Sequence, residues 1–397
     1  MTPPTSSTNP PMPDPSHAIS PSTNPALSIP KSPTPSSRFA YIDGIRALAA
    51  LFVVLCHAWY EPTNGYYKTR LFNHLGLSYG PIAVAVFIVV SGFCLTLPLA
   101  KRDGDLGSVL EFFRRRARRI LPPYYACIIL SCIFILTLAN KPTGTVWDIC
   151  LPLNGTTFLQ HVLLIHNLVP AGSGGSINYP LWSIAVEAQI YLLFPLVAIL
   201  LQKRGWKVTM WGLVALGLAA QVALYRIAPD TRVWYLGCFG FGVAAAWQSV
   251  RGKTTLLWTK MGLWLGGLTL LALVLGGRNG YGTLKPIFDL LIGGAAALIM
   301  GGCYADREQK SGITRLLSLR PLERVGIFSY SLYLVHAPLL HLHYLILTRL
   351  FHSPKPETMF LLLLLTLPLI VAEAYLFFLA FERPFLSKKT RVTDKAA

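Results

Sequence analysis

Apolar runs long enough to cross a bilayer recur along the chain from residue 43 onward. A transmembrane helix needs about 20 predominantly apolar residues. Segments of this kind lie near 43–60, 81–100, 120–139, 180–201, 207–228, 232–250, 256–277, 284–303, 325–350 and 358–382. The pattern therefore predicts an all-α fold, a polytopic helical membrane protein with about ten transmembrane helices.

The two ends of the chain have a different composition. Of the 29 prolines, 11 lie at or before Pro35, among many serines and threonines and without an apolar stretch behind basic residues. We predict residues 1–38 to be a disordered Pro/Ser/Thr-rich cytoplasmic tail rather than a signal peptide, and residues 387–397 to be a basic cytoplasmic tail. Residues 39–386 would form the transmembrane domain.

One long connection interrupts the pattern between residues 140 and 179. It contains a short apolar stretch at 158–169, which is too short to cross, followed by the glycine-rich AGSGGS at 171–176. We expect a re-entrant or interfacial segment and a flexible turn on the outer side.

Composition and charge agree with a membrane protein. The 397 residues are 53% hydrophobic and 13% charged, with a mean hydropathy of +0.51. The net charge of +18 comes from Lys and Arg in short connections, with no basic-aromatic module, so nucleic-acid binding is excluded. With both termini inside, roughly 25 of these cations are cytoplasmic against roughly 9 outside. The seven cysteines show no CxxC or Cys/His ligand spacing, so we predict neither disulfides nor a metal site.

The first apolar run carries three ionisable residues, Asp43, Arg46 and His57. Charged groups within a span are costly and usually functional. Arg46 and His57 are eleven residues apart, close to three helical turns, so they share a face about 16 Å apart along the axis. The alternative is that His57 is only a packed, hydrogen-bonded residue.

Five arginines stand at the cytoplasmic end of the third run, within FFRRRARRILPPYY at 112–125. Arg115, Arg116 and Arg119 have i, i+1, i+4 spacing, which predicts a patch of forked donors suited to phosphate groups. The alternative is attraction to anionic lipid headgroups.

The fourth run places Ser183, Glu187 and Tyr191 on one helical row. Glu187 would lie about 10 Å below the outer face and His57 about 9 Å below it, from a rise of 1.5 Å per residue and a core of about 30 Å. Equal depths predict that the carboxylate approaches the imidazole and raises its basicity. A polar clip between the first and fourth helices is the alternative.

Together these features predict a phosphate-sized basic site at the cytoplasmic end of the helices and an acid/base pair toward the outer half of the membrane. A donor with a phosphorylated head and a long thin arm, such as coenzyme A, suits this arrangement. His336 in the ninth run is either catalytic or a structural hydrogen-bond partner. Asp289 and Glu373 lie within predicted spans without an evident role, and the outer His161 and His166 are expected to bind no ligand.

The polar residues of the predicted spans form a set of short motifs in a fixed order along the chain. They are Asp43-Gly44-x-Arg46 with His57 eleven residues after the arginine, Ser91-Gly92-Phe93, Arg115-Arg116-x-x-Arg119, Trp182-Ser183-x-x-x-Glu187, Ser329-Tyr330-Ser331 leading to His336, and Glu382-x-Pro384. This set resembles the acyltransferase-3 family of integral-membrane O-acyltransferases over about residues 40–386.

The resemblance implies transfer of an acyl group, most often acetyl, from acyl-CoA to hydroxyls of saccharides, lipid-linked sugars or secondary metabolites. The resemblance also implies that Arg46, His57, Arg116 and Arg119 belong to the active site. Some family members have a further extracytoplasmic hydrolase-like domain, which has no counterpart in these residues, so we expect direct transfer to the acceptor.

The resulting prediction is an acyl-CoA-dependent O-acyltransferase of a bacterial inner membrane that acts on a cell-surface or lipid-linked saccharide. We predict catalytic roles for His57, Glu187, Arg46 and Asp43, donor binding by Arg115, Arg116, Arg119 and Arg46, and supporting roles for Ser183, Tyr191, His336 and Glu382. His57 would act as general base or transient acyl carrier. Acetyl-CoA would be a co-substrate rather than a bound cofactor.

Other partners would be the lipid bilayer, the saccharide or glycolipid acceptor and envelope polysaccharide assembly proteins. Two rival classes remain open. A proton-coupled transporter of a sugar or lipid-linked precursor also carries buried ions, although the two halves of the chain show no convincing repeat. The second rival class is a non-catalytic membrane partner in a polysaccharide assembly complex.

Overall fold

The computed structural model describes residues 39–63, 77–169, 175–228, 231–306, 308–352 and 354–386. The predicted tails at 1–38 and 387–397, and most of the predicted flexible turn at 171–176, lie outside the described residues. All seven cysteines are free thiols.

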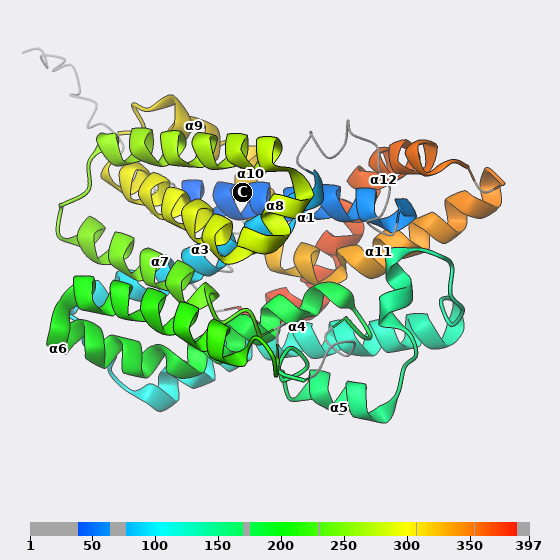
Figure 1. The fold of residues 1–397 in the computed structure, drawn as a ribbon, viewed down its shortest axis with the longest axis horizontal. Helices are drawn as coiled ribbons and strands as arrows, with labels where there is room; N and C mark the ends of the chain where they lie inside the picture. Colours follow the sequence, from blue (N-terminus) through cyan, green and yellow to red (C-terminus); the bar gives the residue numbers. More distant parts are fainter. Residues whose placement is uncertain are drawn as a thin grey trace, which may run out of the picture. The chain divides into compact units, whose positions relative to one another are not determined.

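Among the described residues, eight helical segments are long and apolar enough to cross a membrane, so the predicted helical membrane fold is confirmed. They belong to α1 (Ala40–Thr63), α3 (Pro81–Ala100), α4 (Val109–Thr137), α6 (Trp182–Leu224), the two ends of α8 (Leu256–Ala305), α11 (Ser329–Leu350) and α12 (Pro356–Phe377) (Figure 1). Shorter elements connect them: η2 (Leu77–Tyr79), η3 (Val146–Cys150), α5 (Gly155–Val162), η4 (Tyr179–Leu181), α7 (Tyr235–Val250), α9 (Gly312–Leu317), α10 (Arg320–Ile327), the π-helical η6 (Phe378–Glu382) and η7 (Arg383–Phe385).

The predicted count of ten is not confirmed, and two elements explain the difference. α6 contains both the fourth and the fifth predicted spans, and Gly205 interrupts it with a non-helical backbone at φ 79° and ψ 172°. A straight helix of 43 residues would be about 65 Å long, twice the hydrocarbon thickness. The break at Gly205 therefore allows the two arms of α6 to fit within the bilayer. α7, the sixth predicted span, is only 16 residues long but is largely buried against α3 and α6.

The connection at 140–179 contains no spanning helix in its described part. The eight-residue α5 is capped by Asn154, the residue before it, whose side chain accepts a hydrogen bond from the backbone of Thr157. His161 in the last turn of α5 and His166 beyond it stack with ring centroids 3.9 Å apart, and both are fully buried. Burial, together with His161 beside it, lowers the pKa of His166 to about 3. The two histidines are therefore uncharged at neutral pH, and their imidazole rings pack flat against each other.

Glycine allows α1 to approach α9 and α10 at backbone contact. A Cβ on Gly44 would lie 1.8 Å from the carbonyl oxygen of Leu317, and a Cβ on Gly326 would lie 2.0 Å from the carbonyl oxygen of Asp43. Both obstacles are backbone atoms that a rotamer change cannot remove. The close approach positions the first turns of α1, and therefore Arg46, against α10.

Gly44→Ala is expected to destabilise the fold by about 1–3 kcal/mol or more, because the added methyl group forces α1 away from α9. The measurement is the thermal midpoint of the purified protein in detergent. The matched control is Gly267→Ala in α8, where a Cβ meets no atom within 4 Å, and which should be neutral or slightly stabilising. Equal midpoints for both variants would contradict the close packing.

Two carboxylates without a predicted role join helices. Asp289 of α8 is fully buried and accepts hydrogen bonds from Trp234 Nε1 at 3.0 Å and from the Tyr281 hydroxyl at 3.2 Å. Glu373 of α12 lies 3.3 Å from Nε2 of His343 in α11. Both therefore act as polar links within the helix bundle.

Candidate active site

A cavity lies among α1, α3, α4, α6, α10 and α11. It encloses about 930 Å³ of empty space, counting its open mouth. Seven of the predicted residues line it together: Arg46, Arg116, Arg119, Ser183, Glu187, Tyr191 and Glu382. These residues come from four stretches of sequence more than 60 residues apart, so the fold gathers the polar positions of otherwise apolar helices into one site.

Three guanidinium groups give the cavity its cationic character. Arg46 is held from two sides: Nη1 lies 3.3 Å from the Asp43 carboxylate one turn earlier, and Nη2 donates to Cys94 Sγ of α3 at 3.7 Å. Arg116 and Arg119 are one turn apart on α4, so both face the cavity. The Nε of Arg116 is buried and has no hydrogen-bond partner among the described residues. Asp43 does not line the cavity and contributes by positioning Arg46.

Arg115 does not join this group. Its side chain is 56% exposed and its Nη1 lies 3.9 Å from Glu111, on the outside of α4. Consecutive residues on a helix point about 100° apart, and here Arg116 lines the cavity whereas Arg115 does not. The structure thus narrows the predicted phosphate patch to Arg116 and Arg119 with Arg46.

The predicted pairing of Glu187 with His57 is not what the structure shows. The Glu187 carboxylate accepts hydrogen bonds from the hydroxyls of Ser91 and Tyr191, and these two hydroxyls lie 3.1 Å apart. Equal depth in the bilayer did not imply contact, because the rotation of each helix about its axis also decides which side chains meet. Glu187 instead organises the wall of the cavity between α3 and α6.

Ser91 was missed as a site residue because Ser91-Gly92-Phe93 predicts close helix packing. Gly92 does have that role: a Cβ there would lie 2.4 Å from the carbonyl oxygen of Phe239 in α7. Its neighbour Ser91 points about 100° away and reaches Glu187. The signal was the hydroxyl next to the packing glycine.

His57 pairs with His336 of α11. Nδ1 of His57 lies 2.7 Å from Nε2 of His336, and the two rings are nearly parallel, with an interplanar angle of 6°. Nδ1 of His336 lies 2.7 Å from the carbonyl oxygen of Tyr333. Neither histidine lines the cavity, but Tyr333 does, and its ring centroid is 5.5 Å from that of His336. The histidine pair therefore lies directly behind the Tyr333 wall.

Ser183 and Glu382 complete the site at two ends. Ser183 donates to the Tyr333 hydroxyl at 2.7 Å, and that hydroxyl donates to the carbonyl of Pro180 at 3.1 Å. Glu382, only 1% exposed, accepts a hydrogen bond from Ser331 at 2.5 Å. This hydrogen bond joins η6, which contains Glu382, to α11 beside the arginines.

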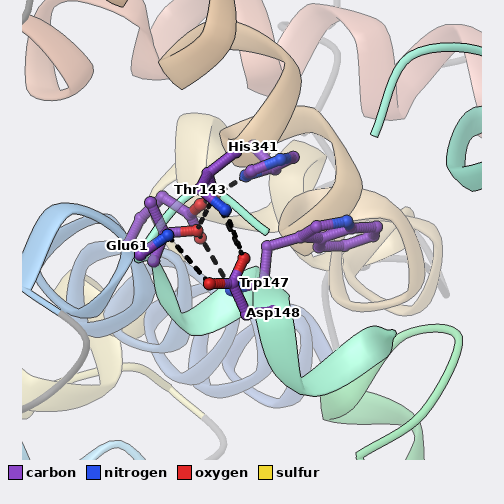
Figure 2. Close-up of polar contacts among 7 residues, drawn as sticks. Glu61, Thr143, Trp147, Asp148 and His341 are labelled. Carbon is purple, nitrogen blue, oxygen red and sulfur yellow. Dashed lines mark hydrogen bonds and ion pairs between the residues drawn. The ribbon is translucent and has the colours of Figure 1, made fainter. Parts of the chain in front are cut away.

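A second polar cluster lies beyond the histidine pair, where residues of the connection at 140–179 meet Glu61 of α1 and His341 of α11 (Figure 2). Glu61 and His341 are both fully buried, and Nδ1 of His341 lies 2.6 Å from the Glu61 carboxylate. The ring of Trp147 stacks on His341 with centroids 5.1 Å apart. Asp148 accepts hydrogen bonds from the backbone N–H groups of Thr143 and Gly144 and holds the turn that carries Trp147. Glu61 was missed in the sequence because it lies just past the predicted end of the first span.

Comparison with known proteins gives a family match over most of the chain. A sequence model of the acyltransferase-3 family, described as an acyltransferase domain, matches residues 39–379. The acyltransferase MdmB of Streptomyces mycarofaciens is 31% identical over 323 residues, which cover 75% of this chain and 78% of that protein.

Two further relatives are named as O-acetyltransferases. The putative peptidoglycan O-acetyltransferase YrhL of Bacillus subtilis is 28% identical, and the O-acetyltransferase OatA of Staphylococcus aureus is 25% identical, each over 75% of this chain. The matched region spans 48% of YrhL and 50% of OatA, about half the length of each. No solved structure matches.

Proposed function

Since the chain belongs to the acyltransferase-3 family, we propose that it is a membrane O-acyltransferase that moves an acetyl group from acetyl-CoA to a hydroxyl of a cell-surface or lipid-linked saccharide. The observation that carries the donor assignment is the cavity that combines Arg46, Arg116 and Arg119. Two relatives named as O-acetyltransferases, one of them putatively of peptidoglycan, support the acetyl group and the saccharide acceptor.

The arginines suit the phosphates of the donor. A guanidinium group offers paired N–H donors that match phosphate oxygens, and it keeps its charge at every physiological pH. The buried Nε of Arg116 has no partner in the part of the chain that the structure describes, and a phosphate oxygen would supply one. The cavity continues from these arginines to Ser183 and Tyr333, next to the histidine pair. This length suits a donor whose reactive thioester is remote from its phosphates.

His57 is the proposed reactive group, by one of two routes. As a general base, it removes the proton of the acceptor hydroxyl while the oxygen attacks the thioester carbonyl; the C–S bond breaks and the leaving thiolate receives a proton. As a nucleophile, its nitrogen takes the acetyl group first, CoA leaves, and the acceptor hydroxyl then attacks the acetyl-imidazole. The first route requires both substrates to be bound together, and the second gives ping-pong kinetics.

The proposed orientation places the arginines and both termini in the cytoplasm of a bacterial inner membrane. Arg46 follows the first turn of α1, Arg116 and Arg119 lie in the first half of α4, Glu382 ends η6, and all four line one cavity. The first and last described helices thus reach the arginine-rich side, which the positive-inside rule assigns to the cytoplasm. Cytoplasmic acetyl-CoA would enter there.

Arg116→Ala is expected to raise the KM for acetyl-CoA by about 10- to 100-fold, because hydrogen bonds to a charged group contribute about 1.5–3 kcal/mol. The measurement is transfer of label from acetyl-CoA to alkali-labile ester on cell-envelope saccharides in membranes that carry the protein. The matched control is Arg114→Ala, since Arg114 is 77% exposed and forms an ion pair with Glu111 on the surface of α4.

Each result has a defined meaning. Neither a transporter nor a non-catalytic partner needs coenzyme A, so native membranes without acetyl-CoA binding would support those rivals. An unchanged KM in Arg116→Ala would contradict the donor site. Label on a secondary metabolite, with none on any saccharide, would move the acceptor to that class.

A further inference from the structure

The environment of His57 assigns a role to His336. His57 extends from α1 and His336 from α11, 279 residues later, and the two imidazoles share one hydrogen bond. His336 is fully buried, and its second nitrogen, Nδ1, faces the backbone carbonyl of Tyr333. The chemistry of these partners determines where the protons lie.

The proton positions follow from the carbonyl of Tyr333. A carbonyl oxygen can only accept a hydrogen bond, so Nδ1 of His336, at 2.7 Å, carries the proton. In a neutral imidazole the other nitrogen is then an acceptor, so Nε2 of His336 accepts from Nδ1–H of His57. The neutral pair therefore leaves Nε2 of His57 without a proton and with a lone pair available for reaction.

The backbone around His336 is held in place by a hydrogen-bond arrangement that Pro338 creates. Proline has no N–H, so the carbonyl of Leu334, four residues earlier, lacks its helical partner. Asn178 Nδ2 donates to this carbonyl at 3.0 Å, and Cys127 Sγ approaches it at 3.1 Å. The turn that carries Tyr333 and His336 is thereby tied to α4 and to the outer connection.

We propose that His336 is a positioning residue that holds His57 in the tautomer with a proton on Nδ1, so that Nε2 is the reactive nitrogen. This inference rests on the proposed function in one respect, which is that His57 is the reactive imidazole. It replaces the role that the sequence assigned to Glu187, whose carboxylate is occupied by Ser91 and Tyr191. His336 touches neither substrate.

The test compares two substitutions of His336 in the full-length protein. His336→Gln keeps a carbonyl acceptor near the position of Nε2, whereas His336→Leu fills the space without one. Leucine is expected to lower kcat about 10- to 100-fold, as losses of supporting hydrogen bonds commonly do, with the KM for acetyl-CoA unchanged. Glutamine is expected to recover most of kcat. Equal kcat values for the native, Gln and Leu proteins would overturn the proposal.

A second readout does not depend on activity. Nitrogen-15 NMR of histidine-labelled protein in bilayers reports which ring nitrogen carries the proton, and the His57 signal is identified by its absence in His57→Ala. The expected native result is a protonated Nδ1 and an unprotonated Nε2, and in His336→Leu a shift toward the other tautomer. A native His57 protonated on Nε2 would overturn the proposal even if transfer is observed. Absence of transfer with the expected tautomer would contradict the proposed function alone.

Discussion

His57→Ala is expected to lower the rate of acetyl transfer by about 10²–10⁴-fold, the usual contribution of a positioned acid or base. Binding of acetyl-CoA should persist, because His57 does not line the cavity that holds the three arginines. The measurement pairs the rate of ester labelling with equilibrium binding of acetyl-CoA, at matched expression. The loss of rate without loss of binding would separate the reactive centre from the donor site.

The control for this prediction is His352→Asn. His352 is exposed after α11 and has a left-handed backbone with φ 53°, which asparagine also tolerates. This variant should label saccharides at the native rate. Equal labelling by the native chain and His57→Ala would make His57 structural and remove the centre of the proposed site. If labelling is lost only in His57→Ala, the kinetic pattern then separates the two routes, since an acetyl-imidazole gives ping-pong behaviour.

Glu61→Ala is expected to destabilise the protein by about 3–5 kcal/mol, the usual effect of removing one partner of a buried pair. Glu61 and His341 are fully buried, and the imidazole would lose its acceptor at 2.6 Å while Trp147 still covers it (Figure 2). The measurement is the unfolding free energy or the thermal midpoint in detergent. Glu61→Gln retains an acceptor and should lose clearly less stability.

An exposed ion pair provides the comparison. Arg251 and Asp103 are 3.3 Å apart, but the Asp103 side chain is 95% exposed, so losing this ion pair should leave the midpoint unchanged. The control variant is Asp103→Asn, because Asp103 has a left-handed backbone with φ 51°, which asparagine also tolerates. Should Glu61→Ala match this control, the buried pair would contribute nothing, and the connection at 140–179 would be held by other contacts. Hydrogen exchange at 143–150 would then show no added opening in the variant.

The sequence alone was sufficient for the class of fold and for the polar rows. Backbone groups in lipid must bond within their own segment, so a long apolar run dictates a helix without reference to its neighbours. Helical periodicity likewise placed Ser183, Glu187 and Tyr191 on one face, because that relation depends only on residues in one segment. The arginines at the start of α4 followed from local spacing in the same way.

The number of membrane-spanning helices could not be determined without the tertiary structure. Hydropathy separates the runs on either side of Gly205 into two predicted spans, and the chain does form two helical arms there, which follow each other without a loop across the non-helical Gly205. The buried α7 is shorter than an ordinary span because α3 and α6 cover it, so its length is set by protein packing rather than by lipid.

The partners within the site were also decided by packing. Depth along the membrane normal could be counted from the sequence, but the rotation and position of each helix could not. For this reason Glu187 met Ser91 and Tyr191, while His57 met His336, which comes from a helix 279 residues later. Arg115 and Arg116 are adjacent in sequence, yet only Arg116 lines the cavity, because the neighbours of α4 determine which of its faces is covered.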